Sequence, residues 1–104
     1  REIVSNLRDF RHERVRGALE ALVNSRSDEI RFFALDGLSG YPSAEIVPLF
    51  AQRLIDDPSQ RVKALACELA IEHGLNFSAW RDRLEGKLGE QYKLDASGLI
   101  ERRR

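Results

Sequence analysis

The feature that most constrains this chain is an internal repeat with a period of 32 residues. A shift by that period places apolar residues on apolar residues and serine on serine: Val15 on Val47, Leu22 on Leu54, Ser27 on Ser59, Ile30 on Val62 and Ala34 on Ala66. Each unit has the pattern of a helix, a short turn and a second helix. One helical pair cannot bury its apolar stripe alone, so such units are stable when they are stacked. The repeat therefore predicts an all-α protein built from stacked helical pairs.

Helical spacing and capping residues set the predicted boundaries of the second helix in each unit. Its apolar face is predicted to carry Ile30, Phe33, Ala34, Gly37 and Leu38 in the first unit, and Val62, Leu65, Ala66, Leu69 and Ala70 in the second. Ser27 and Ser59 stand where N-caps belong, because a serine hydroxyl accepts a hydrogen bond from a free N–H group of the first turn. Gly40 suits the C-cap of the first unit, Ser43 suits the N-cap of the helix that follows, and Gly74 should end the second unit.

The two ends of the chain are less regular than the repeated units. A short helical stripe near the beginning is separated from the next helix by a break in phase at residues 11–12, and it consists of Ile3, Leu7 and Phe10. After Ser78 a further helix is expected, with Trp80, Leu84 and Leu88 on one face. A last helix is suggested by residues 95–104.

These patterns predict the domain organisation. The whole chain, 1–104, is interpreted as a single domain of six or seven helices, because no run alternates as a strand would. Its parts are a cap helix at 1–11, repeat units at about 12–41 and 43–74, and a partial unit at 78–104.

The turn of the second unit is similar to that of a known repeat family. The segment 54–59, followed by Val62, Lys63 and Ala66, resembles the short bacterial form of the HEAT-repeat family, which also occurs in phycobilisome-lyase-like proteins. The family's signature, an acid followed five residues later by valine and then by a basic residue, is here Asp57, Val62 and Lys63. The first unit keeps Ile30 and Arg31 but has Ser25 where the acid belongs. The resemblance covers about residues 12–90.

The HEAT resemblance implies a fold and a class of function. The fold is an α-solenoid of two clear helical hairpins plus irregular terminal helices. Most members of the family are scaffolds that bind other molecules, so the resemblance implies a binding module.

The amino-acid composition excludes or disfavours several classes of function. The chain has 17 basic and 17 acidic residues and a formal net charge of zero, whereas nucleic-acid-binding domains normally carry a basic excess. Its 42% of apolar residues is too high for a disordered tail. No apolar run is long enough to cross a membrane, so no membrane partner is expected. One cysteine and no visible signal peptide make the cytoplasm the default location.

Three sets of residues are of types found in metal, catalytic or nucleic-acid sites, but each has a simpler structural explanation. His12-Glu13 resembles the His-Glu pairs of HEAT-like di-iron hydroxylases, but a metal site needs three or four converging ligands. Cys67 lies beside the apolar face of its helix and is expected in the core. Trp80 is followed by residue types that HEAT-like DNA glycosylases use, yet it aligns with the core residue Ile46. We therefore expect no catalytic residue, no metal and no cofactor.

The second helices of the units should line the concave side, by analogy with the HEAT family. Their polar positions carry both signs of charge, which suits a protein partner better than a nucleic acid. The sequence thus predicts a non-catalytic interaction module that binds a protein. The residues expected to contact that partner are Arg31, Phe32, Asp36, Lys63 and Glu68.

Three alternatives remain open from the sequence. The first is nucleic-acid binding through the arginine-rich ends, at residues 8–16 and 101–104. The second is an enzyme or a lyase subunit, as in the phycobilisome-lyase relatives, which would hold a chromophore or a metal. The third is a segment of a longer solenoid with no activity of its own.

Overall fold

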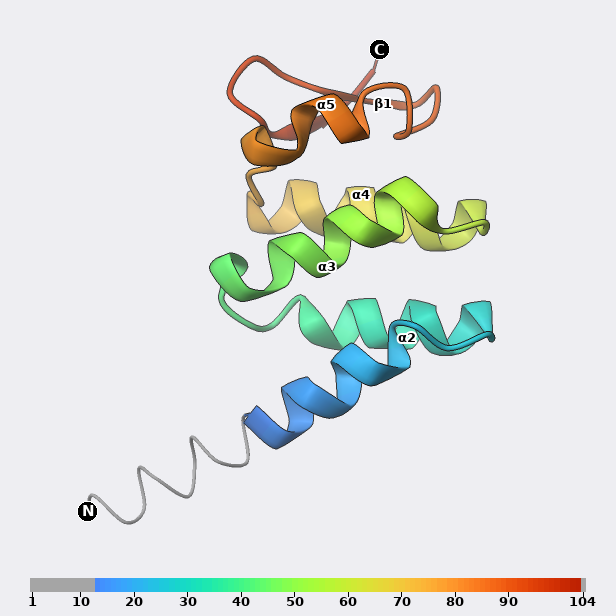
Figure 1. The fold of residues 1–104 in the computed structure, drawn as a ribbon. Helices are drawn as coiled ribbons and strands as arrows, with labels where there is room; N and C mark the ends of the chain where they lie inside the picture. Colours follow the sequence, from blue (N-terminus) through green and yellow to red (C-terminus); the bar gives the residue numbers. More distant parts are fainter. Residues whose placement is uncertain (1–12, 104) are drawn as a thin grey trace, which may run out of the picture.

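The computed structural model describes residues 13–103, with the exception of the side chain of Ser43, and the chain is mostly helical (Figure 1). The expected cap helix at 1–11, His12 and Arg104 lie outside the described residues. A first helix occupies residues 13–22. The elements that follow are α2 (Asp28–Leu38), α3 (Ser43–Asp56), α4 (Gln60–His73), the 3-10 helix η1 (Ser78–Trp80), α5 (Arg81–Leu84), β1 (Tyr92–Leu94) and β2 (Ile100–Arg102).

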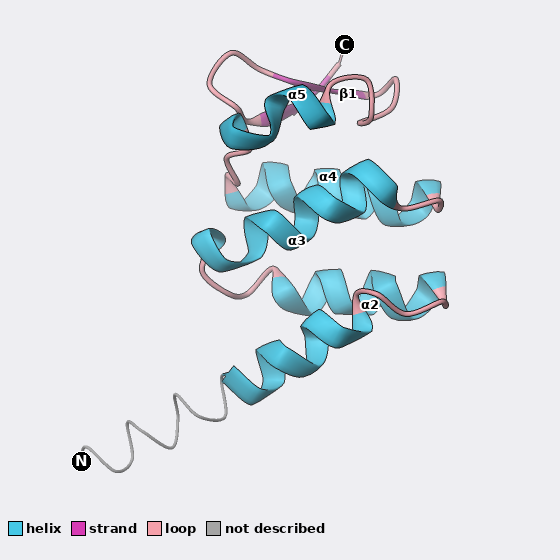
Figure 2. Cartoon of the chain, in the orientation of Figure 1, coloured by secondary structure: helices cyan, strands magenta, loops and turns pink. Residues whose placement is uncertain are grey.

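The elements form two layers (Figure 2). The helix 13–22, α3 and α5 lie in one layer, and α2, α4 and the β1–β2 hairpin lie in the other. The helix α4 is central, because it contacts α2, α3 and β2. Arg16 joins the helix 13–22 to the start of α3 through an ion pair of 2.5 Å with Glu45.

The predicted N-caps of α2 and α4 are confirmed. The Ser27 hydroxyl accepts a hydrogen bond from the backbone N–H of Ile30, and the Ser59 hydroxyl accepts one from that of Val62. Gly74 ends α4 in the left-handed conformation, with φ of 61°, as the sequence indicated. At the start of α3 the prediction was wrong by one residue, because Pro42 is the N-cap and the helix begins at Ser43.

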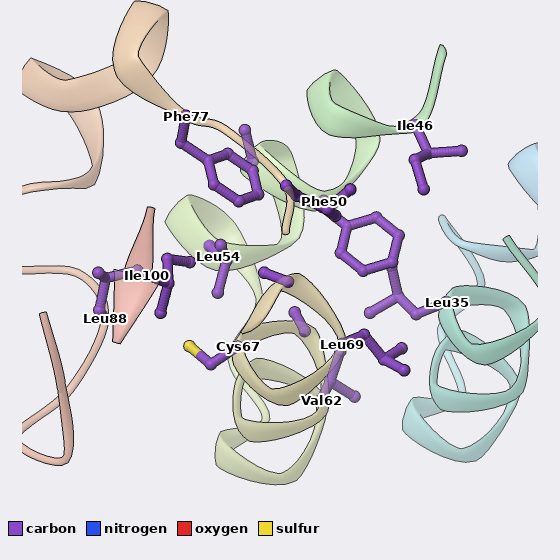
Figure 3. Packing of buried hydrophobic residues seen from close by; sticks show 14 of the residues in the cluster. Leu35, Ile46, Phe50, Leu54, Val62, Cys67, Leu69, Phe77, Leu88 and Ile100 are labelled. Atoms are coloured by element: carbon purple, nitrogen blue, oxygen red, sulfur yellow. The ribbon is translucent and has the colours of Figure 1, made fainter. Parts of the chain in front are cut away.

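The core lies between the two layers. Ile46, Phe50 and Leu54, spaced at one helical turn along α3, are fully buried, and the Phe50 ring points toward Leu35 of α2 (Figure 3). Leu35 of α2 points toward α4, where Val62 and Leu69 lie. Burying a leucine, isoleucine or phenylalanine side chain stabilises a fold by about 1.5–3 kcal/mol. The contact of α2 and α3 with α4 therefore supplies the main stabilisation of the stack.

The predicted apolar face of α2 was wrong in phase. The buried residues of this helix are Arg31, Ala34, Leu35 and Leu38, whereas Ile30 is 40% and Phe33 is 74% exposed. Helical spacing of apolar residues does not predict this rotation of α2. That rule places apolar side chains in the core and assigns an arginine such as Arg31 to the surface. Here Arg31 has a buried partner, and the helix turns to bring the two together.

The C-terminal part differs most from expectation. The long helix expected after Ser78 is limited to η1 and the single turn of α5, because Gly86 and Gly89 adopt positive φ angles of 78° and 88°. The helix expected at 95–104 is instead an antiparallel hairpin, in which Lys93 pairs with Glu101. The prediction of helices alone was therefore wrong for these residues.

The turn at 95–98 explains why a hairpin forms there. Asp95 Oδ1 accepts hydrogen bonds from the backbone N–H groups of Ser97 and Leu99, at 2.9 and 3.0 Å. Gly98 has φ of 97° and approaches Ser78 so closely that a Cβ atom would lie 2.7 Å from its backbone nitrogen. These residues fold the chain back onto α4, where β2 takes the place that a further helix would occupy.

Candidate functional site

One continuous surface is formed by the outward sides of α2 and α4. Residues three or four positions apart share a helical face, and the outward face of α2 carries Glu29, Phe32 and Asp36. The equivalent face of α4 carries Arg61, Glu68 and Glu72. We call these six residues the α2–α4 surface. It contains acidic, basic and aromatic side chains side by side.

A cation–π contact joins the two helices at this surface. The guanidinium carbon of Arg61 on α4 lies 4.5 Å from the centre of the Phe32 ring on α2. Phe32 is half-buried, so one part of the ring packs on the core and another is covered by Arg61. Such a contact contributes about 0.5–1 kcal/mol at an exposed site. It also holds a planar, charged group in a fixed position on the surface.

Glu68 ties the hairpin to the edge of the α2–α4 surface. It accepts a hydrogen bond of 2.6 Å from the Tyr92 hydroxyl and forms an ion pair with Arg102 on β2. The Arg102 guanidinium, with help from Tyr92, lowers the pKa of the Glu68 carboxyl. Burial, together with the Glu68 hydrogen bond, raises the pKa of Tyr92 to about 12. Glu68 is therefore held in place, with both of its oxygens in contact with the hairpin.

Arg31, which was expected on the surface, lies inside the molecule. Its side chain donates to both carboxylate oxygens of Asp57, at 2.8 and 3.0 Å, and to the carbonyl oxygens of Ser25 and Arg26. Arg31 is 6% exposed and Asp57 is 2% exposed. Ser25 corresponds to Asp57 in the 32-residue repeat, and it contributes its backbone carbonyl to this cluster. The guanidinium is thus engaged within the fold and does not face a partner.

Lys63 occupies the position in α4 that corresponds to Arg31 in α2. It is half-buried and lines an open hollow between α4 and the segment before β1, together with Gln60, Glu90 and Tyr92. Lys63 therefore borders the α2–α4 surface instead of lying at its centre. Of the five residues expected to contact a partner, Phe32, Asp36 and Glu68 share the surface.

Two residues of this region were not among those expected from the sequence. Arg61 belongs to the polar positions of the second helix but was not singled out, since an aromatic partner on another helix cannot be read from helical spacing. Arg102 was considered only as part of the arginine-rich end at 101–104, within a suggested last helix. The turn-forming residues Asp95 and Gly98, between the short segments 92–94 and 100–102, are the signal that could have placed Arg102 in a hairpin.

The other candidate residues do not form a reactive site. Cys67 is fully buried, and burial raises the pKa of its thiol to about 12, which disfavours the nucleophilic thiolate. Trp80 packs partly against the core and is covered on one side by Arg83, 5.2 Å from its ring. His73 is exposed at the end of α4. Within residues 13–103, no three acidic, histidine or cysteine side chains are grouped so that they could hold a metal.

The hollows of the described structure are small or open. One of about 140 Å³ lies beneath the hairpin and is lined by residues that include Arg81, Leu84, Tyr92 and Arg103. Pockets that enclose a small-molecule ligand usually measure about 300–1,000 Å³. Larger hollows, beside α4 and along β2, are wide open to solvent. In the part of the chain that the structure covers, no helix is both long and apolar enough to cross a membrane.

Comparisons with protein-family models, curated proteins and solved structures found no match to this chain.

Proposed function

We propose that this chain is a HEAT-like solenoid module that binds a protein partner through the α2–α4 surface. The observation that carries the proposal is the stacking of Arg61 on Phe32, on two helices whose exposed faces also carry the acids Asp36 and Glu68. Aromatic and arginine side chains are the types most often found at the energetic centre of protein interfaces. Fixed side chains on packed helices lose little conformational freedom on binding, so a partner docks without a large entropic cost.

Several contacts support a HEAT-like stack. The capping serines recur 32 residues apart, and α2 packs beside α4. The Arg31–Asp57 ion pair joins the first helical pair to the second, in the manner expected for a family whose signature contains an acid and a base. The pair formed by the helix 13–22 and α2, the pair formed by α3 and α4, and the C-terminal segment then follow one another along one stack.

The charge of the α2–α4 surface favours a protein over a nucleic acid. Five of its six residues are acidic or aromatic, namely Glu29, Phe32, Asp36, Glu68 and Glu72. A phosphate backbone attracts clusters of lysine and arginine, and its binding weakens steeply with salt. Mixed charges instead select a complementary protein surface and disfavour wrong partners.

A charge swap at the α2–α4 surface tests the proposal. The double variant Asp36→Lys with Arg61→Glu reverses one charge on each helix of the surface, removes the cation–π contact and leaves the net charge unchanged. Purified wild-type and variant chains are used as bait in lysate of the source organism, with and without nuclease, and bound proteins are identified by mass spectrometry. We expect at least one protein that binds the wild type after nuclease treatment and is lost with the variant.

The matched control is the double variant Asp82→Lys with Arg83→Glu. It makes the same two exchanges in α5, which lies in the other layer, and it removes the contact of Arg83 with Trp80. This control should retain every protein that the wild type binds. Proteins lost equally with both variants, or binding that disappears after nuclease treatment, would contradict the proposal. Circular dichroism of each variant verifies that the helices are intact.

A further inference from the structure

The hollow beneath the β1–β2 hairpin is lined by three cationic side chains. Arg81 of α5, Lys93 of β1 and Arg103, which follows β2, all border it. Among the described residues of its wall, the acid is Glu85, which is exposed. Lys93 already has an acidic partner, because its ammonium group lies 3.1 Å from Glu101. The positive charge in excess at the hollow therefore comes from the two arginines, although the whole chain is neutral.

Backbone carbonyl groups of the hairpin orient both guanidinium groups. The Nη2 atom of Arg81 donates hydrogen bonds to the carbonyl oxygens of Asp95 and Ala96. The Nε atom of Arg103 donates to the carbonyl oxygen of Tyr92, at 3.2 Å. Within residues 13–103, neither arginine forms an ion pair with a carboxylate. The carbonyl groups thus hold the two cations in place but leave their full charges uncompensated.

Each guanidinium group keeps donors for a ligand. A guanidinium carries five N–H donors on three nitrogen atoms, and the hydrogen bonds above use one nitrogen of each arginine. The remaining two nitrogens of a guanidinium form a planar fork, which matches two oxygens of a carboxylate or a phosphate. Two such forks that border one hollow suit an anion with more than two oxygens and more than one negative charge.

The size of the hollow agrees with this chemistry. Its volume of about 140 Å³ is too small for most organic ligands, yet it has room for the four oxygens of a phosphate. A water molecule takes about 30 Å³ in the liquid, which sets the scale for one such oxygen. A phosphate group also carries nearly two negative charges at neutral pH, whereas a carboxylate carries one.

We propose that the hollow beneath the hairpin binds one phosphate group, which Arg81 and Arg103 contact from two sides. The phosphate is either free or the end of a small monoester whose remaining atoms extend into solvent. The inference is independent of the proposed protein-binding function, because neither arginine belongs to the α2–α4 surface.

Calorimetric titration of the full chain tests the site with inorganic phosphate, glycerol 3-phosphate and acetate. The buffer contains about 0.1 M sodium chloride, which screens charges more than about 10 Å apart. One phosphate should bind per chain, and acetate should bind about tenfold more weakly or less, because it lacks the second charge. Tighter binding of glycerol 3-phosphate would identify a monoester as the ligand, and weaker binding would identify free phosphate. Acetate that binds as tightly as phosphate, or no saturable binding of either phosphate compound, would overturn the proposal.

Two substitutions and a matched control locate the binding. Arg103→Gln should weaken the binding of phosphate by about tenfold, since it removes a hydrogen bond between charged groups. Arg81→Lys keeps the charge but loses the planar fork, so it should weaken binding as well. Arg83→Gln removes the same charge from α5 at a residue that contacts Trp80, and it should change the affinity by less than about twofold.

Equal losses of affinity in Arg103→Gln and Arg83→Gln would overturn the proposal, because the anion would then respond only to the general charge of this end. Circular dichroism verifies that each variant is folded. If Arg103→Gln does not fold, Arg103→Lys is compared with Arg83→Lys in the same titration, and the first alone should weaken binding.

Discussion

Arg31 and Asp57 form a buried, two-pronged ion pair that joins α2 to the turn between α3 and α4. The Nε and Nη2 atoms of Arg31 donate to separate oxygens of Asp57, and the two residues are 26 positions apart in the chain. Asp57 Oδ1 also accepts from the backbone N–H of Ser59, the N-cap of α4. One carboxylate therefore links the first helical pair to the start of the last long helix.

Removal of this carboxylate should be strongly destabilising. In Asp57→Ala, the Arg31 guanidinium keeps its buried position but loses its counter-charge, and the backbone N–H of Ser59 loses its acceptor. Breaking one side of a buried ion pair costs about 3–5 kcal/mol. Urea denaturation followed by circular dichroism should show a loss of that size in the free energy of unfolding. Asp36→Ala, at an exposed site on α2, should change it by no more than about 0.5 kcal/mol. Equal effects of the two variants would mean that the ion pair does not hold the units together.

Among the glycines of this chain, Gly98 should be the one whose replacement by alanine lowers the stability most. Its φ of 97° is unfavourable for any other residue, and the new Cβ would meet the backbone nitrogen of Ser78 at 2.7 Å. Gly98→Ala should therefore destabilise the chain by at least about 1–3 kcal/mol. Gly17→Ala is the matched substitution, since Gly17 lies in the helix 13–22 with open space around its Cα. Alanine there should stabilise by about 0.5–1 kcal/mol. Thermal unfolding of both variants gives the comparison, and a harmless Gly98→Ala would exclude the turn described for 95–98.

Tyr92 should make the hairpin sensitive to alkaline pH. Its pKa of about 12 lies above the ordinary value of 10, so the folded state disfavours ionised tyrosine. The contribution of Tyr92 to stability is therefore complete below pH 10 and is lost as the pH rises from 10 to 12. The free energy of unfolding of the wild type should fall over this range more steeply than that of Tyr92→Phe. Parallel pH profiles of the two proteins would contradict the burial of this hydroxyl beside Glu68.

Cys67 should be unreactive toward thiol reagents in the folded chain. Its thiol is buried and its pKa is raised to about 12, so almost no thiolate is present at neutral pH. A chromogenic disulfide reagent should react with less than one thiol per chain within minutes in buffer, and with one thiol in strong denaturant. Rapid labelling without denaturant would show that the hairpin opens readily from α4.

The sequence was most informative where a local rule determines structure. Ser27, Ser59 and Gly74 mark helix ends through contacts within a few residues, and each was predicted correctly. The rotation of α2 could not be predicted in this way. It depends on a carboxylate 26 residues away, which removes Arg31 from the surface and leaves Phe33 outside.

The C-terminal hairpin was missed for a different reason. Its strands have three residues each, which is too short for an alternating pattern to stand out from a helical one. The turn residues Asp95 and Gly98 carried the better signal. Because a helix was expected where the hairpin lies, the ion pair of Arg102 with Glu68 was not predicted. The candidate surface was therefore predicted only in part.

The most direct test of the protein-binding account is a footprint of the captured partner on this chain. Amide hydrogen exchange is measured for the chain alone and in complex with the protein that the charge-swap experiment identifies. The account predicts slower exchange in peptides that cover residues 29–36 and 61–72, with little change at 13–22 and 81–91. Protection confined to those latter segments, with α2 and α4 unaffected, would contradict it.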